Sequence, residues 1–87
     1  MRFMAVFIQH EIACAVGFED LTDAEDFLFW GYEEYELLPC GIYDLLTGET
    51  LCYEHRGRSV GLFEPDLIRL TATEYVTAAT RLSRKAS

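Results

Sequence analysis

The most constraining feature of the sequence is an unbroken apolar segment near its start. Residues 3–8 read FMAVFI, without a polar position. A strand with one solvated face alternates apolar and polar residues, so a segment that is apolar throughout predicts a strand covered on both faces. We therefore expect residues 3–8 to form a central strand of a sheet.

A second apolar stretch, residues 12–18, follows almost directly. No Gly, Pro or Asn lies between the two stretches to mark a turn. The second stretch either extends the first strand past a bulge or pairs with it after a turn that the sequence does not reveal.

The next segment has the pattern of an amphipathic helix. Thr22 and Glu25 have the spacing of a capping box, which favours a helix start at this point. We expect the helix to end near Gly31, as a left-handed residue, and the alternative is that it continues to Leu38. The apolar positions at helical spacing are Ala24, Phe27, Leu28, Gly31, Tyr35 and Leu38.

A β-hairpin is the clearest pattern in the chain. Residues 41–46 and 50–55 favour strands and are separated by Thr47, Gly48 and Glu49. A three-residue hairpin loop commonly places glycine at positive φ, so we expect Gly48 to adopt that conformation. Residues 56–59 then predict a turn and residues 60–63 a short strand.

The remaining sequence predicts helical structure. Residues 64–66 favour a single helical turn with Pro65 at its first position. Thr71 and Glu74 repeat the capping-box spacing and predict the start of a terminal amphipathic helix. Its apolar stripe is Ala72, Tyr75, Val76, Ala79 and Leu82, and its C-terminal end carries Arg81, Arg84 and Lys85. We expect residues 83–87 to form a frayed basic tail.

This order of elements predicts an α+β fold. The economical arrangement is a small antiparallel sheet of three to five strands with two helices packed on one face. A chain of 87 residues with 51% apolar residues is large enough for one hydrophobic core. No linker or internal repeat interrupts it, so we expect a single compact domain over residues 1–87.

Charge is distributed unevenly along the chain and excludes some partners. Residues 1–55 hold one basic and 12 acidic residues, a net charge of −11, whereas the remainder carries +3. The total of −8 argues against direct binding to nucleic acid, whose phosphates attract cations. No segment has the 18 consecutive apolar residues that a membrane span requires, so we expect no membrane partner.

Cysteine usage indicates a compartment. Cys14, Cys40 and Cys52 are an odd number and form no CxxC pair. Free thiols are typical of a reducing environment, so we expect a cytoplasmic protein. The apolar segment at residues 3–8 is too short for a secretory signal.

The sequence contains no recognisable catalytic, nucleotide or metal motif. It lacks a CxxC pair, an HExxH helix and a glycine-rich phosphate loop, so we expect no enzyme activity, no metal and no cofactor. One cationic cluster, His55, Arg56 and Arg58, is a candidate anion-binding site if its side chains converge with the amides of the turn. The alternative is a solvated basic turn.

Aromatic residues concentrate in residues 27–35, which hold five of the 12 in the chain. A helix of ordinary diameter cannot turn all of them towards one core. Phe27 fits the inward face, so a second layer must cover the others unless they form an exposed patch with an acidic rim. The candidate interaction residues are Phe29, Trp30, Tyr32, Glu33, Glu34 and Tyr35.

These patterns predict a small acidic, non-enzymatic protein-interaction module. An aromatic centre with a polar rim is typical of interface anchors, and a homodimer is its commonest form. The partner is then a second copy or a basic protein. The alternatives are an inhibitor or immunity-type protein whose acidic face blocks a basic enzyme, and a small-ligand or anion-binding protein that uses the cluster at His55.

Overall fold

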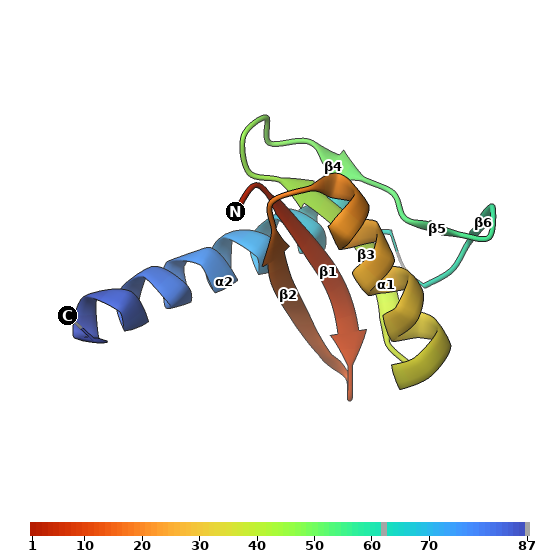
Figure 1. The fold of residues 1–87 in the computed structure, drawn as a ribbon, viewed down its shortest axis with the longest axis horizontal. Coiled ribbons are helices and arrows are strands. Elements are labelled where there is room, and N and C mark those ends of the chain that lie inside the picture. Colours follow the sequence, from red (N-terminus) through yellow and green to blue (C-terminus); the bar gives the residue numbers. More distant parts are fainter. Residues whose placement is uncertain (62, 87) are drawn as a thin grey trace.

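The computed structural model describes residues 1–61 and 63–86, with side chains described up to residue 77 in the last helix. This part of the chain forms a four-stranded antiparallel sheet, a two-stranded sheet and two helices, so the α+β prediction is confirmed (Figure 1). In chain order the elements are β1 (Phe3–Gln9), β2 (Ile12–Phe18), α1 (Leu21–Tyr35), β3 (Leu38–Asp44), β4 (Thr50–Leu51), β5 (Glu54–His55), β6 (Arg58–Ser59) and α2 (Pro65–Ala86).

The larger sheet has the strand order β2-β1-β3-β4, so β1 is central, as its apolar residues predict. On one face, Phe3 and Phe7 pack in a core with Leu28 of α1. On the other face, Val6 packs with Ile68 of α2. The helices therefore cover opposite faces (Figure 1), and the expectation of two helices on one face is wrong. A strand that is apolar on both sides needs a covering layer on each.

The second apolar stretch pairs with the first through a tight turn. β1 and β2 are antiparallel, with Gln9 opposite Ile12. The two residues between them have positive φ, 52° at His10 and 66° at Glu11, as a type I′ turn requires. Neither residue is glycine or asparagine, so no typical turn residue marks this position in the sequence.

The first helix is longer than expected, and its cap differs. α1 begins at Leu21 after Asp20, whose side chain makes no capping hydrogen bond, so the predicted capping box at Thr22 is wrong. The helix passes through Gly31 and ends at Tyr35, so the predicted end at Gly31 is also wrong. A Cβ at position 31 would collide with the Leu37 side chain, so the glycine lets Leu37 pack closely against this face of the helix.

The predicted hairpin forms, but its first strand spans Leu38–Asp44 and not residues 41–46, so its loop is longer than the three residues expected, and its second strand is divided. β3 pairs with β4, and Gly48 has the expected positive φ of 78°. β5 instead pairs with β6 in the smaller sheet, across a turn at Arg56 and Gly57 with φ values of 53° and 79°. The strand expected at residues 60–63 is absent from the described positions 60, 61 and 63, because the pairing ends at Ser59.

The two helical segments expected near the C-terminus are one helix. α2 begins at Pro65 and continues through Thr71, which is buried, so the predicted helix start at Thr71 is wrong. The predicted stripe positions Ala79 and Leu82, and the predicted basic tail at residues 83–87, concern side chains outside the described set. The same holds for Arg81, Arg84 and Lys85.

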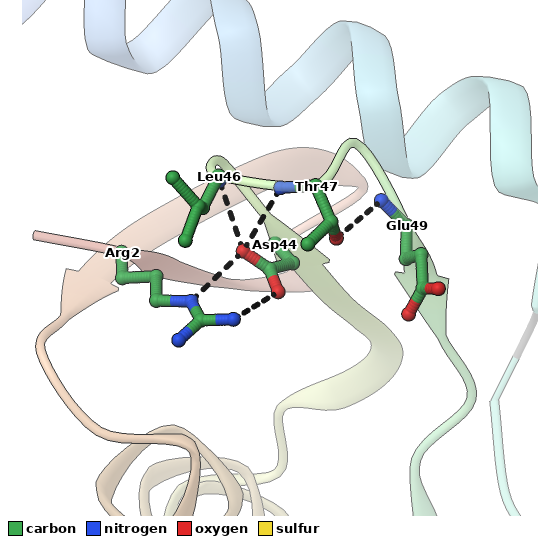
Figure 2. A network of polar contacts seen from close by, with 5 residues as sticks. All are labelled: Arg2, Asp44, Leu46, Thr47 and Glu49. Carbon is green, nitrogen blue, oxygen red and sulfur yellow. Dashed lines mark hydrogen bonds and ion pairs between the residues drawn. The ribbon is translucent and has the colours of Figure 1, made fainter.

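A buried aspartate holds the turn after β3 (Figure 2). Asp44 is 5% exposed and accepts hydrogen bonds from Nε and Nη2 of Arg2, at 3.1 and 3.0 Å, and from the backbone N–H of Leu46 at 2.9 Å. The Arg2 hydrogen bond contributes most, and with the turn amides it lowers the pKa of Asp44 to about 2 although burial opposes this. The network joins the start of the chain to the β3–β4 turn.

Candidate functional site

The two flanks of α1 face different neighbours. Ala24, Leu28 and Gly31 are the buried residues of the helix and face the sheet. The other residues of α1 therefore lie on the two flanks of this buried stripe or on the face turned away from the sheet. One flank borders an open groove, and the other carries the β5–β6 hairpin. The aromatic residues of α1 are divided between them.

The first flank borders a groove of about 380 Å³. We call it the α1 groove, and it is lined by Phe18, Asp23, Asp26, Phe27, Trp30, Gly31, Tyr35 and Leu37. Phe27 lies between Phe7 and Phe18, with ring centroids 5.4 and 5.3 Å away, and anchors this flank to the sheet. Trp30 is 55% exposed and Tyr35 is 70% exposed, so two large aromatic side chains line the groove and face solvent.

The charge at the α1 groove is entirely acidic. Asp23 and Asp26 belong to its lining, which includes no basic side chain among the described residues. Both carboxylates lie one helical turn apart on the helix that also carries Trp30. An apolar surface beside carboxylates favours the binding of a ligand in which a basic group lies next to an apolar group.

The second flank packs on the smaller sheet through His55. This side chain is only 6% exposed. Its ring stacks on Phe29 with centroids 4.5 Å apart, and its Nδ1 lies 2.8 Å from the hydroxyl of Tyr53. Its Nε2 lies 3.1 Å from Oε1 of Glu33, which also accepts hydrogen bonds from Nε and Nη2 of Arg56 at 3.1 and 2.9 Å. We call Phe29, Tyr32, Glu33, Tyr53, His55 and Arg56 the His55 cluster.

Electrostatics in the His55 cluster favour a structural role. The hydrogen bonds from Arg56, and then from His55, lower the pKa of Glu33, so this carboxylate is ionised at neutral pH. Burial, and then the charges of nearby carboxylates, raise the pKa of Tyr53, so its hydroxyl stays protonated. With a proton on Nε2 and none on Nδ1, the His55 ring donates to Glu33 and accepts from the Tyr53 hydroxyl, so each of the three groups has a hydrogen-bond partner. The arrangement fixes the β5–β6 hairpin to α1.

The predicted aromatic interaction residues divide between the two flanks, and the rings of Phe29 and Trp30, with centroids 5.1 Å apart, connect the two groups. Trp30 and Tyr35 line the α1 groove, whereas Phe29 and Tyr32 contact His55 on the other flank. One alternative from the sequence was a second layer of structure over the aromatic residues. The β5–β6 hairpin forms such a layer on the flank of Phe29 and Tyr32, but not over the α1 groove. Glu33 binds His55 and Arg56, and Glu34 is exposed.

The three predicted anion-binding residues do not converge on an open site. His55 and Arg56 both bind the Glu33 carboxylate, which occupies the place expected for an external anion. Arg58 is exposed on β6 and pairs in register with His55. The alternative of a solvated basic turn holds for Arg58, and the Arg56 side chain also stays 72% exposed although it binds Glu33.

Sequence reasoning missed the contribution of Phe18, Asp23 and Leu37 to the α1 groove. The spacing of Asp23, Asp26 and Trp30 places them on one helical flank and could have indicated Asp23. Phe18 and Leu37 reach the groove from outside the helix, and no local pattern gives their positions.

Comparisons with known protein families, curated proteins and solved structures found no match for this chain. Among the described residues, no three His, Cys, Asp or Glu side chains gather as a metal-binding group. Neither helix, over the part that is described, combines the length and apolar character needed to cross a bilayer.

Proposed function

We propose that the protein is a non-enzymatic interaction module that binds a basic segment of another protein in the α1 groove. The observation that carries the proposal is the pairing of two exposed aromatic side chains, Trp30 and Tyr35, with the carboxylates of Asp23 and Asp26 around one apolar groove. Aromatic anchors supply most of the binding energy at such surfaces, and complementary charge sets partner choice and association rate.

The acidic lining argues against a second copy as the occupant. Two α1 grooves face to face would bring Asp23 and Asp26 against the same residues of the other copy, and like charges there oppose association. A segment with Lys or Arg beside a Trp, Phe or Leu side chain meets both properties of the groove. The dimer expected from the sequence must therefore use another surface.

The non-enzymatic part of the proposal rests on how the titratable groups are used. The chain from Glu33 through His55 to Tyr53 is the arrangement most like a proton relay, and its Tyr53 end is 6% exposed. Its hydrogen bonds are accounted for by the packing of the β5–β6 hairpin. Free Cys14, Cys40 and Cys52 fit the reducing cytoplasm.

An inhibitor or immunity-type role is a special case of this proposal. Its occupant would be a basic surface loop of an enzyme, and binding in the α1 groove would block that enzyme. The anion-binding alternative is not carried further, because Glu33 already engages two of its three side chains, His55 and Arg56.

The test exploits Trp30, the only tryptophan of the chain, as a fluorescent reporter in the groove. Randomised peptides displayed on phage are selected against the protein, and the enriched peptides are titrated while Trp30 emission is followed. We expect enrichment of Lys or Arg next to a large apolar residue, an emission change on binding, and an affinity that falls as salt rises.

Variants locate the binding energy. Trp30→Ala should weaken the selected peptides roughly 30-fold, as loss of a central aromatic anchor of about 2 kcal/mol does. Asp23→Asn with Asp26→Asn should weaken them up to about tenfold and flatten the salt dependence. The matched control, Glu49→Gln with Glu54→Gln, removes the same charge from exposed positions elsewhere. No enrichment, no basic preference, or equal binding to all variants would overturn the proposal.

A further inference from the structure

β2 is an unpaired edge of the larger sheet. It is the outermost strand, and the N–H of Arg2 donates to the carbonyl of Phe18, so Phe18 directs its backbone groups towards the β1 side. In an antiparallel pair the direction alternates along a strand, so Ala13, Ala15 and Gly17 direct theirs away from the sheet. The Tyr75 hydroxyl donates to the Ala13 carbonyl at 3.4 Å. Within the described residues, no hydrogen bond reaches the outward groups of Ala15 and Gly17.

The sequence of β2 does not protect this edge. Natural edge strands carry charged residues, proline or bulges that prevent pairing with another chain. β2 reads IACAVGF and has no charged residue or proline, in a chain of which 25% is charged. Two of its apolar side chains, Ile12 and Val16, are 61% and 39% exposed. The register with β1 places them on the α1 face of the sheet, together with Cys14 and Phe18.

α2 extends beyond the same edge. It crosses the sheet on the face opposite α1, contacts β2 through Tyr75 and continues past that strand (Figure 1). Val76 packs against the core beneath α2. The residues from 77 to 86 make about 15 Å of helix at 1.5 Å per residue, the width of roughly three strands. In the sequence, the apolar spacing of Ile68, Ala72 and Val76 continues at Ala79 and Leu82. The helix backbone after Val76 thus extends beyond the edge strand β2, and we call this part of α2 the overhang (Figure 1).

We propose that a second copy of this chain pairs antiparallel across β2, with Ala15 opposite Ala15 of the second copy. The two sheets become one of eight strands, and the overhang of each α2 covers the neighbouring sheet. This register aligns all seven residues of β2. Ile12 then faces Phe18 of the second copy, and Cys14 faces Val16 of the second copy.

A second copy fits better than an extended peptide. An extended peptide would form hydrogen bonds with the edge of β2 but would offer no surface to the overhang of α2. A second copy supplies a strand that pairs with β2 and a sheet on which the overhang can pack. α2 covers Ala15, and its Tyr75 reaches Ala13. The proposed dimer therefore requires the two α2 helices to pass side by side over the two-fold axis, each displaced towards Ala13 of its own β2.

Charge gives the proposed dimer its own signature. The register brings Glu11 near Glu19 of the second copy, and each chain carries −8 overall. Added salt screens this repulsion, so dimerisation should strengthen with salt. Peptide binding in the α1 groove should weaken under the same change. The two proposals are therefore separable, and neither depends on the other.

Sedimentation and disulfide trapping test the dimer directly. Val16→Cys places a new thiol opposite native Cys14 of the second copy, at a non-hydrogen-bonded pair where side chains approach closely. We expect rapid oxidation to a covalent dimer with peptides 14 and 16 linked in mass spectra. Leu46→Cys, also exposed but located beyond β3, is the matched control and should not give rapid dimers.

Val16→Lys should raise the dimer dissociation constant roughly 100-fold, because the two-fold axis places the charge twice in one interface. Leu46→Lys should leave the constant unchanged. Circular dichroism checks that Val16→Lys is folded, and the trapping experiment decides the proposal if it is not. A monomer at every concentration and salt, or trapped dimers without the 14–16 link, would overturn it. So would a dimer that Trp30→Ala dissociates and Val16→Lys does not.

Discussion

Arg2 and Asp44 lie 42 residues apart and form a two-point ion pair, in which Nε and Nη2 of the guanidinium each donate to a different carboxylate oxygen (Figure 2). Asp44 also accepts the N–H of Leu46, so one carboxylate joins the start of β1 to the turn after β3. Two parallel hydrogen bonds between charged groups fix geometry as well as energy. The pair accounts for the low pKa of Asp44.

This pair predicts a pH dependence of stability. The pKa of Asp44 falls from 3.8 to about 2 in the folded protein, so the ionised form stabilises the fold above the ordinary value, and this contribution is lost as pH falls towards 2. Urea unfolding at a series of pH values should show it. Asp44→Asn should be less stable than the unaltered protein at neutral pH, and its free energy of unfolding should fall less on acidification. Glu54→Gln should behave like the unaltered protein, and an unchanged acid profile in Asp44→Asn would contradict the assignment.

The His55 cluster predicts coupling between two buried side chains. His55→Phe keeps an aromatic ring against Phe29 but leaves the Tyr53 hydroxyl without its acceptor, so the free energy of unfolding should fall by about 1–3 kcal/mol. Tyr53→Phe removes the same hydrogen bond and should cost about 1 kcal/mol. The free energy of unfolding of the double variant should fall by less than the sum of the two single losses, with a coupling energy of roughly 1 kcal/mol. Additive losses in chemical denaturation would argue that the two residues act independently.

Two glycines with similar φ predict different costs of substitution. Gly57 has a φ of 79° and Gly61 of 76°, so alanine is strained at both by about 1–2 kcal/mol. A Cβ at Gly57 meets no atom within 4 Å, whereas a Cβ at Gly61 would collide with the backbone oxygen of Pro39. Gly57→Ala should therefore lower stability by about 1 kcal/mol and Gly61→Ala by roughly 2–4 kcal/mol. Equal losses on denaturation would show that the contact at Gly61 relaxes.

The elements that could be predicted from the sequence are those set by local patterns. Residues 3–8 form the central strand, and Gly48 has positive φ, because both depend on side chains within a few positions. The turn at His10 and Glu11 could not be predicted, because the pairing of β1 with β2 imposes positive φ on residues that seldom adopt it.

Other outcomes depended on contacts between distant segments. Gly31 lies inside α1, where Leu37 packs against it, and Thr71 lies inside α2, where it is buried. The surroundings of the aromatic side chains likewise depend on where the β5–β6 hairpin lies, because it stacks His55 on Phe29 while the neighbouring Trp30 lines the α1 groove. The sequence showed that the aromatic residues exceed one helical face, and only the tertiary fold assigns them to two.

The three thiols predict an order of chemical reactivity. Cys40 is 2% exposed, and burial, with a smaller contribution from Glu64, raises its pKa, so little reactive thiolate forms. Cys52 is exposed and Cys14 is half-buried on β2. Labelling with a thiol reagent, followed by mass spectrometry, should modify Cys52 first and Cys40 only after unfolding. Cys52→Ser should remove the fastest phase, and Cys14 should react more slowly in concentrated protein because the second copy covers β2. Fast modification of Cys40 in the folded protein would contradict its burial.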